Sequence, residues 1–490
     1  MRYRLKLFPE ITIKSRAVRQ EMVRSLRTNI RNSLSRFIPE VRVADCWDAL
    51  EVRHDGELDA STRAEVEAGL SRIPGIHEIL VVEAHTFSGF EQTAMLLVPL
   101  WRDALAGQRF RVSAKRRGRH DFTSEDLECH LGRALLEAAD GASVDLGDPQ
   151  ITVRLELKDE QLLLVTRRLP GLGGYPLGTQ GEALALISGG FDSPVAAWRL
   201  LRRGLKTHFV FFNLGGPAHE AAVREVVHHL WQGYAVSHRL NFISVPFEDV
   251  VNEIQRRVPA SVAGVVLKRM MLRAANRVAG RARIPALATG DALAQVSSQS
   301  LTNLRLIDAV SERPILRPLI ASDKQTIIDE ARRIGTAAFA EGLPEYCGAV
   351  SKRPNVHPRA QQIERAEGDF DFGVLDAALE AAVLTRASRL LDEPPRAAEV
   401  TESHASSVMA SAESVTVIDI RHPDEHEAAP LRLVHGEPLL IPFFELAERA
   451  EQLPRDRRYL LYCAQGVMSR MQAQLLADKG FSQFGVYRDD

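Results

Sequence analysis

The pattern of hydrophobic positions predicts a strand followed by a helix at the start of the chain. Tyr3, Leu5 and Leu7 alternate with polar residues, which is typical of a strand with one buried face. Met22 and Ile30, with Leu26 between them, then recur at the spacing of one helix face. We expect these elements to form a first domain over residues 1–60.

Residues 61–168 predict a second domain of strands and a capped helix. Phe110, Val112 and Ala114 alternate with polar residues and indicate a strand. Thr123 and Asp126 have the spacing of a capping box, so a helix is expected to begin there. The apolar runs at 151–155 and 162–165 are expected to form paired strands.

Residues 176–395 alternate apolar runs with helical patterns, which is typical of a parallel sheet covered by helices. The predicted strands lie at 183–187, 207–212, 241–245 and 286–288. Ligands in such sheets bind beyond the carboxyl ends of the strands. A linker over 396–413, rich in Ser, Ala, Glu and Pro, leads to a fourth segment over 414–490, which opens with a strand from Val415.

Composition supports a multidomain enzyme of the cytoplasm. The 490 residues exceed what one hydrophobic core usually serves, and 45% hydrophobic with 26% charged residues is ordinary for globular proteins. No apolar run reaches the roughly 18 residues of a membrane span, and the first residues lack the apolar core of a signal peptide. Four widely separated cysteines argue against a disulfide scaffold or a zinc site, so no metal site is expected.

The net charge of −2 conceals a basic front and an acidic rear. Residues 1–50 carry 11 Lys and Arg against 5 Asp and Glu, whereas residues 404–490 carry 9 against 13. The segment 109–119 holds six basic residues and no acidic one. This asymmetry predicts a polyanionic partner for the front of the chain.

The most specific motif is Ser-Gly-Gly-Phe-Asp-Ser at 188–193, directly after the apolar run 183–187. Glycines let a backbone approach a ligand closely, and the N–H groups at the start of the following helix favour an anion such as phosphate. The loop is shorter than a Walker loop and lacks its Gly-Lys-Ser/Thr end. It resembles the PP-loop of enzymes that split ATP between the α and β phosphates.

Two further segments resemble known modules. The basic strand end and the helix after it resemble a THUMP domain, an RNA-binding module, whose phosphate contacts would come from Arg109, Arg111, Lys115, Arg116 and Arg117. The strand that ends at Cys463, followed by a glycine-bearing loop and a helix, resembles a rhodanese domain. Backbone N–H groups of such a loop stabilise a thiolate or persulfide.

In this order the modules resemble the tRNA 4-thiouridine synthetase (tRNA uracil 4-sulfurtransferase) family over nearly the whole chain. The resemblance implies a multidomain α/β and α+β protein: a ferredoxin-like domain (1–60), a THUMP domain (61–168), a PP-loop ATP pyrophosphatase domain with a parallel sheet (176–395), a linker (396–413) and a rhodanese domain (414–490). It also implies a homodimer.

The family adenylates a uridine oxygen of tRNA, at position 8, and replaces it with sulfur. ATP with Mg²⁺ is the substrate, and no tightly bound cofactor is implied. By resemblance, Asp192 organises the phosphates or the transition state and Lys324 supplies positive charge there. The implied ATP contacts are Leu186, Ile187, Ser188, Gly189, Gly190, Ser193, Lys268, Gly290 and Gln299.

The resemblance also assigns the sulfur chemistry. Cys463 carries a persulfide supplied by a cysteine desulfurase, and its outer sulfur reaches the activated uracil directly or after release as sulfide. Cys347 is the resolving thiol, which leaves a Cys347–Cys463 disulfide. Gln465 stands where many rhodanese loops have Arg, so the thiol depends more on backbone N–H groups and on Arg470.

Other functions remain open at this point. The chain could instead relay sulfur only to the thiamine sulfur-carrier protein for thiazole biosynthesis, a role that family members commonly combine with tRNA thiolation. An amidotransferase or NAD synthetase relative is disfavoured, because no glutaminase-like domain is present and the front is basic. An RNA-binding protein with an inactive ATPase is disfavoured by the intact phosphate loop.

Overall fold

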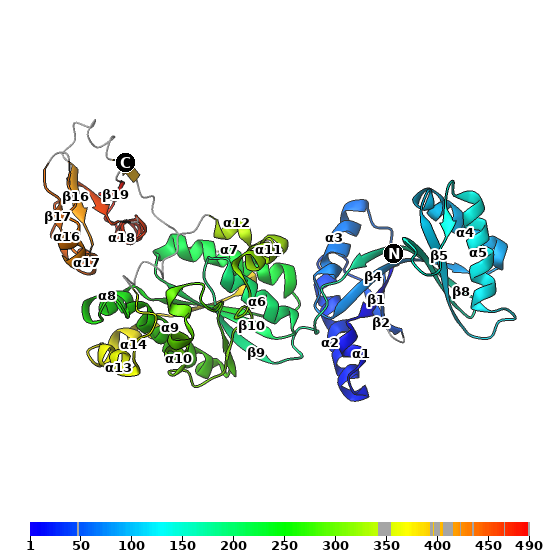
Figure 1. Ribbon diagram of the computed structural model, residues 1–490, viewed down its shortest axis with the longest axis horizontal. Helices are drawn as coiled ribbons and strands as arrows, with labels where there is room; N and C mark the ends of the chain where they lie inside the picture. The colour runs from blue at the N-terminus through cyan, green and yellow to red at the C-terminus, as the bar shows by residue number, and fades with distance from the viewer. Residues whose placement is uncertain are drawn as a thin grey trace. The chain divides into compact units, whose positions relative to one another are not determined.

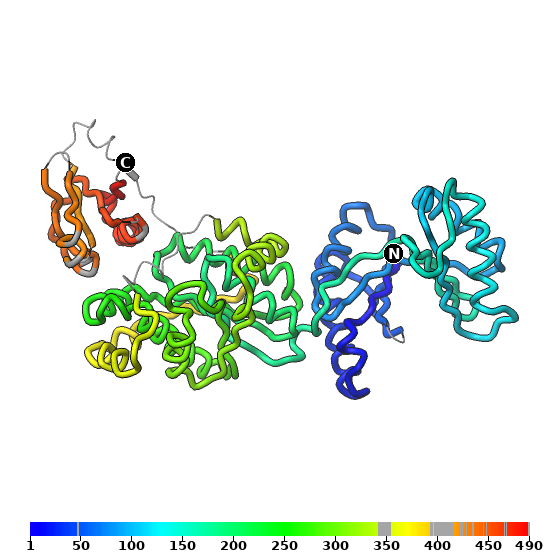
Figure 2. The backbone as a smooth tube through the Cα atoms, in the orientation of Figure 1, coloured from blue at the N-terminus to red at the C-terminus, as the bar shows by residue number. Residues whose placement is uncertain are grey.

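The structure is a computed structural model, and it describes residues 1–46, 49–341, 354–392, 395, 402–404, 415–421, 423–433, 436–464 and 466–488. Two compact units are present: residues 1–179 with 202–204, and residues 180–201 with 205–490. Figure 1 labels their elements, and Figure 2 follows the backbone through both. Within the described residues, every helix is too short or too polar to span a bilayer.

The first unit is built on one continuous sheet with the strand order β2-β3-β1-β4-β8-β7-β5-β6. Neighbouring strands are antiparallel, except that β5 runs parallel to β6 and β7. The predicted alternation is confirmed in β1, where Tyr3, Leu5 and Leu7 are buried. The strands are β1 (Arg2–Leu7), β2 (Arg42–Cys46), β3 (Ala49–Arg53), β4 (Ile76–Thr86), β5 (Arg109–Arg117), β6 (Ser143–Val144), β7 (Ile151–Lys158) and β8 (Gln161–Pro170).

Helices complete two hydrophobic cores in this unit: α1 (Pro9–Thr12), α2 (Arg16–Leu34), α3 (Ala60–Ser71), α4 (Phe90–Leu105) and α5 (Ser124–Ala138). The second core joins α4 and α5 to β5, β7 and β8, and α5 begins with the predicted capping box of Thr123 and Asp126. The first core extends past residue 60, because Val66, Leu70 and Ile79 belong to it. Strand β8 contributes to both cores, through Leu169 to the first and through Leu162 and Leu164 to the second, whereas β4 contributes Ile76 and Ile79 to the first.

The second unit contains a sheet with the order β13-β12-β9-β10-β11-β14, parallel except for β14. Its strands are β9 (Glu182–Leu186), β10 (Lys206–Asn213), β11 (Asn241–Pro246), β12 (Ala286–Ala288), β13 (Ile315–Leu316) and β14 (Val383–Arg386). Residues 207–212 of β10 are all buried, as expected for a parallel strand covered on both faces. The predicted α/β alternation is therefore confirmed.

The carboxyl ends of the parallel neighbours β9 and β12 lie next to each other. Helices connect the strands of this sheet (Figure 1). They are α6 (Asp192–Arg202), α7 (Gly216–Tyr234), α8 (Glu248–Arg257), α9 (Ala263–Ala282), η1 (Ser297–Gln299), α10 (Leu301–Asp308), α11 (Lys324–Ile334), α12 (Ala337–Ala340), α13 (Ala360–Gly368), α14 (Gly373–Glu380) and η3 (Ala387–Arg389).

The end of the chain forms a separate, fully parallel sheet with the order β15-β19-β18-β16-β17. The strands are β15 (Glu402–His404), β16 (Val415–Asp419), β17 (Leu439–Leu440), β18 (Arg458–Tyr462) and β19 (Phe484–Arg488). The helices are α16 (Pro423–Ala428), α17 (Phe443–Ala450) and α18 (Val467–Asp478). Cys463 follows β18 immediately, at the carboxyl end of a central strand.

Candidate active site

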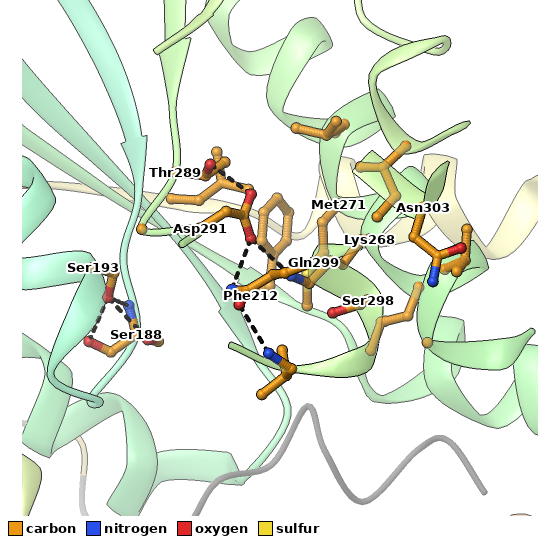
Figure 3. A pocket seen from close by; sticks show the side chains of 18 of the residues that line it. Ser188, Ser193, Phe212, Lys268, Met271, Thr289, Asp291, Ser298, Gln299 and Asn303 are labelled. Atoms are coloured by element: carbon orange, nitrogen blue, oxygen red, sulfur yellow. Dashed lines mark hydrogen bonds and ion pairs between the residues drawn. The ribbon is translucent and has the colours of Figure 1, made fainter. Parts of the chain in front are cut away.

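The PP-loop, residues 188–193, connects buried strand β9 to helix α6, as predicted. The Ser188 N–H donates to Ser193 Oγ at 2.8 Å, and the two hydroxyl oxygens lie 2.9 Å apart (Figure 3). These bonds fold the loop back onto the start of α6. Gly189 is buried and Gly190 is exposed. A short loop held against the start of an 11-residue helix is an arrangement that suits phosphate.

Two side chains from distant segments hold the carboxylate of Asp192. Lys324 Nζ lies 2.9 Å from Asp192 Oδ1, and Gln295 Nε2 donates to Asp192 Oδ2 at 2.8 Å. Lys324 is also stacked over the ring of Phe191, 5.6 Å from its centroid. The structure thus brings together Asp192 and Lys324, which were selected from the sequence. Gln295 was not selected.

Gly290 lies against the PP-loop backbone. A Cβ atom at this position would lie 2.7 Å from Ser193 N and 2.8 Å from Asp192 C. Residue 290 must therefore be glycine for the segment after β12 to approach the start of α6 this closely.

A buried carboxylate, Asp291, organises the opposite wall. Its Oδ1 accepts hydrogen bonds from Lys268 Nζ at 2.8 Å and Gln299 Nε2 at 3.3 Å. Its Oδ2 accepts one from Thr289 Oγ1 at 2.7 Å and one from Arg317 Nε at 3.3 Å. Figure 3 shows Lys268, Thr289 and Gln299 converging on this carboxylate.

The cationic side chains around Asp291 keep its carboxylate ionised. Burial alone would raise the pKa of Asp291, but Lys268, the Thr289 hydroxyl and Arg317 hold that pKa well below its usual range. Asp291 is therefore ionised, and it keeps the cationic ends of Lys268 and Arg317 at the wall. We did not select Asp291 from the sequence, although its place after a Thr-Gly turn at a strand end is a usable signal.

A cavity of about 320 Å³ is lined by Ser188, Asp192 and Ser193 of the PP-loop and by the cluster around Asp291. That volume is within the usual range for small-molecule sites. Phe211 and His219 lie in its wall, and burial lowers the pKa of His219 to about 4, so its imidazole is neutral near pH 7. The lining includes the predicted catalytic residue Asp192. It also includes the predicted ATP contacts except Gly189 and Gly190: Leu186, Ile187, Ser188, Ser193, Lys268, Gly290 and Gln299.

A second candidate centre lies around Cys463. Its Sγ accepts the backbone N–H of Ser469 at 3.3 Å and lies 3.5 Å from Ser469 Oγ. Gly466 begins α18 in a left-handed conformation, with φ of 72°, which turns the loop around the sulfur. Ser469, which the sequence reasoning missed, supplies this contact. Cys347 and Gln465 lie outside the described residues.

A buried ion pair lies beside this sulfur. Arg421 donates through Nε and Nη2 to the two carboxylate oxygens of Asp419, at 2.9 and 2.6 Å. His426 Nδ1 is 3.1 Å from the same carboxylate. The bond to Asp419 first, and then the nearby Tyr462 and Cys463, raise the pKa of Arg421, so this side chain keeps positive charge near the thiol.

The predicted RNA-contacting residues lie within β5 but do not share one face of the strand. Arg109, Arg111, Lys115 and Arg117 alternate with buried residues, whereas Arg116 is on the opposite side, 5.6 Å from the ring centroid of Phe122. Arg109 is paired with Asp145 and Asp148. Among the described residues, no cluster of three or more His, Cys, Asp or Glu side chains is arranged to hold a metal ion.

Comparison with known families places this architecture. A model of the thiamine biosynthesis protein (ThiI) family matches residues 178–372, and a THUMP domain model matches residues 91–167. The tRNA sulfurtransferase of Edwardsiella ictaluri is 47% identical over 488 residues, covering 100% of both chains. That of Klebsiella pneumoniae is 46% identical, again over 100% of both. The chain belongs to the tRNA sulfurtransferase family.

Solved structures agree with this membership in the tRNA sulfurtransferase family. The crystal structure of a 4-thiouridine synthetase–RNA complex with bound ATP has a TM-score of 0.69 and 26% identity, covering 79% of this chain and 99% of that one. PH1313 from Pyrococcus horikoshii Ot3 has a TM-score of 0.52 and 18% identity, covering 68% of this chain and 100% of that one, and shares the fold.

Proposed function

We propose that this enzyme uses ATP to adenylate a uridine of tRNA, at position 8, and replaces the uridine O4 with sulfur to give 4-thiouridine. The observation that carries the proposal is that Ser188, Asp192 and Ser193 of the PP-loop line a cavity of about 320 Å³ while Lys324 is bonded to Asp192. Full-length relatives named tRNA sulfurtransferase support the same reaction.

In the activation step, O4 of the uracil attacks the α-phosphorus of ATP and pyrophosphate leaves. Mg²⁺ enters with ATP as part of the substrate. The loop formed by Ser188, Gly189, Gly190 and Ser193 cradles the phosphates, while Lys324 offsets the negative charge that develops on the α-phosphate. Asp192 holds the Lys324 ammonium in position beside the phosphate site, because the two side chains are bonded before the nucleotide arrives.

The rest of the cavity would hold the nucleoside part of ATP. Leu186 and Ile187 offer backbone groups at the end of β9, and Gly290 gives room for close approach. Lys268 and Gln299 are already oriented by Asp291. Because that carboxylate fixes two of the predicted contacts, the cavity wall is preorganised for its ligand.

In the sulfur step, a cysteine desulfurase loads Cys463 as a persulfide, Cys463–S–SH. The outer sulfur forms a bond to uracil C4, and the C4–O bond breaks so that O4 leaves with AMP. Cys347 then attacks Cys463 Sγ and releases the sulfur on C4. Alternatively, Cys347 attacks first and hydrosulfide adds to C4. Both routes leave a Cys347–Cys463 disulfide, which a dithiol reductant must reduce before the next turnover.

The remaining assignments follow the same family. The tRNA backbone would contact Arg109, Arg111, Lys115, Arg116 and Arg117 in the THUMP domain, which supply charge and register without reading sequence. We propose a cytoplasmic homodimer, without a tightly bound cofactor.

The test is transfer of labelled sulfur from cysteine into unmodified tRNA, with a desulfurase and ATP present. The wild-type chain should form labelled 4-thiouridine and equimolar AMP. Asp192→Ala should form neither, whereas Cys463→Ala should still consume ATP in the presence of tRNA but incorporate no label. Labelled 4-thiouridine at the wild-type level from both variants would contradict the proposal.

A second candidate function is sulfur relay to the thiamine sulfur-carrier protein. The matched family model, described as a thiamine biosynthesis protein, favours it. This role needs the persulfide of Cys463 but not adenylation of RNA. In a host lacking its own relative, Asp192→Ala should then restore growth without thiamine while tRNA thiolation stays absent, and Cys463→Ala should restore neither.

A further inference from the structure

The segment between β12 and η1, residues 289–296, touches the PP-loop at two separate points. The first is the close backbone approach of Gly290 to Asp192 and Ser193. The second is the side chain of Gln295, whose Nε2 donates to Asp192 Oδ2 at 2.8 Å. Between these points the segment is fixed to the cavity wall through Asp291.

The backbone of this segment adopts an unusual conformation just before Gln295. Ala294 has a φ of 63°, in the left-handed region that residues other than glycine rarely adopt. Its N–H donates to the Gln299 carbonyl at 3.0 Å, and the Leu293 N–H donates to the Ile320 carbonyl at 3.0 Å. Because the backbone of Leu293 and Ala294 is held by these two hydrogen bonds, the left-handed turn directs residue 295 back toward Asp192. Such conformations persist where the surrounding structure imposes them, and they cluster at functional sites.

The chemistry of the contact gives Gln295 a defined role. An ionised carboxylate only accepts hydrogen bonds, so the amide must present its N–H groups to Asp192. The other end of the amide, Oε1, is buried and has no hydrogen-bond partner among the described residues. A glutamine retained only for packing would be expected to satisfy both ends, since an unpaired buried acceptor is costly.

The two oxygens of Asp192 therefore have different partners. Lys324, which is 45% exposed at its side chain, holds Oδ1 and is free to follow an incoming phosphate. Gln295 holds Oδ2 from a segment tied down at several points. When Lys324 turns to the nucleotide, Gln295 is left as the described contact that keeps the carboxylate plane in place.

We propose that Gln295 is a positioning residue for the adenylation step: its amide fixes the Asp192 carboxylate, and the left-handed turn at Ala294 aims that amide. This inference rests on the proposed function. It separates Gln295 from the ATP-binding residues, because a positioning residue for Asp192 affects the chemical step more than nucleotide affinity.

The test compares two replacements of similar shape in the full chain. Gln295→Met keeps the volume and removes the donor, while Gln295→Glu keeps the shape and places a negative group against Asp192. We measure tRNA-dependent AMP formation for kcat and equilibrium dialysis of ATP for affinity. Gln295→Met should lower kcat roughly tenfold to a hundredfold. Gln295→Glu should lower it further, and ATP affinity should change less than about threefold for Gln295→Met.

The matched control is Gln362→Met on α13, an exposed glutamine that bonds only the backbone N–H of Arg359 in the described residues. It should leave kcat unchanged. Wild-type kcat in Gln295→Glu would overturn the inference, because packing alone would then explain the residue. Loss of ATP affinity at unchanged kcat would overturn it as well.

Two variants at Ala294 test the geometry. Ala294→Gly should keep wild-type kcat, because glycine accepts the left-handed conformation. Ala294→Val should lower kcat as Gln295→Met does, because a β-branched residue disfavours it. Equal kcat for both would overturn the role of the turn. A wild-type chain that forms no AMP with tRNA would overturn the proposed function itself, whereas normal wild-type turnover with normal Gln295 variants overturns only this inference.

Discussion

A single methyl group added at Gly290 would test how closely the segment after β12 fits against the PP-loop. The new Cβ would lie 2.7 Å from Ser193 N, 2.8 Å from Asp192 C and 2.9 Å from Ser193 Cα. Carbon atoms in contact are normally separated by roughly 3.5–4.0 Å. The two backbone segments would have to move apart by about 0.8 Å, and neither can relieve the contact by rotating a side chain.

The cost of Gly290→Ala follows from that displacement. Overpacking of this kind destabilises a protein by about 1–3 kcal/mol, which urea unfolding monitored by circular dichroism detects. Displacement of a catalytic loop by nearly 1 Å lowers the rate by roughly a hundredfold, so tRNA-dependent AMP formation should fall by that factor. Both effects should appear together, because one contact causes them.

Gly233→Ala is the matched control for Gly290→Ala. Gly233 lies within α7, and a Cβ there would meet no atom within 4 Å. The same methyl group should therefore stabilise the chain by about 0.5–1 kcal/mol through helix propensity and leave AMP formation unchanged. An unchanged urea midpoint together with normal AMP formation in Gly290→Ala would refute the steric argument.

Three further outcomes follow from the two centres. Lys324→Met should lower tRNA-dependent AMP formation by about a hundredfold, whereas Lys324→Arg, measured in the same assay, should retain more activity because charge is kept beside Asp192. The pKa of Asp291 is lowered in the folded chain, so its contribution to stability is full above its ordinary value of about 4 and is lost progressively as the pH falls from there toward the lowered value. The urea midpoints of wild type and Asp291→Asn should therefore differ by a constant amount from pH 7 to about pH 4 and begin to converge below it, and parallel curves below about pH 4 would contradict this. Ser469 Oγ accepts the Cys463 thiol hydrogen, a bond that favours the thiol over the reactive thiolate, so Ser469→Ala should speed alkylation of Cys463 by iodoacetamide roughly twofold to tenfold, and an unchanged rate would mean that the Ser469 hydroxyl does not act on the sulfur.

The local elements of the nucleotide site could be predicted from the sequence because their signals are local. An apolar run that enters a Ser-Gly-Gly turn specifies β9, the PP-loop and α6 within about twenty residues. The Thr-Gly turn before Asp291 marks that residue, but its charged partners Lys268 and Arg317 could not be predicted, since only the folded sheet brings them to it. Charge pairing across such distances along the chain is not encoded in any short pattern.

Gln295 was unpredictable for a different reason. Its role depends on the backbone of Ala294, and alanine carries no sequence signal for a left-handed conformation. Similarly, Arg116 belongs to a basic run, but strand alternation puts it on the other side of β5 from Arg117. The run of charge alone therefore predicted more residues on one RNA-contacting face than the strand places there. The extent of the first core past residue 60 was also hidden, because α3 is separated from that core's first strands by a charged segment.

Strand β8, which the two cores of the first unit share, limits how the chain can be divided. Strand β8 is hydrogen-bonded to β4 from Pro170–Glu78 to Gln161–Thr86, and along this length its apolar residues pass from the first core, at Leu169, to the second, at Leu164 and Leu162. A truncation that removed either half would leave unpaired backbone groups at the edge of the remaining sheet. It would also expose apolar side chains that pack against the removed half. The two halves therefore form one structural unit, and recombination between relatives should exchange them together. An RNA-binding fragment of this enzyme should accordingly begin at Met1 rather than at the THUMP boundary.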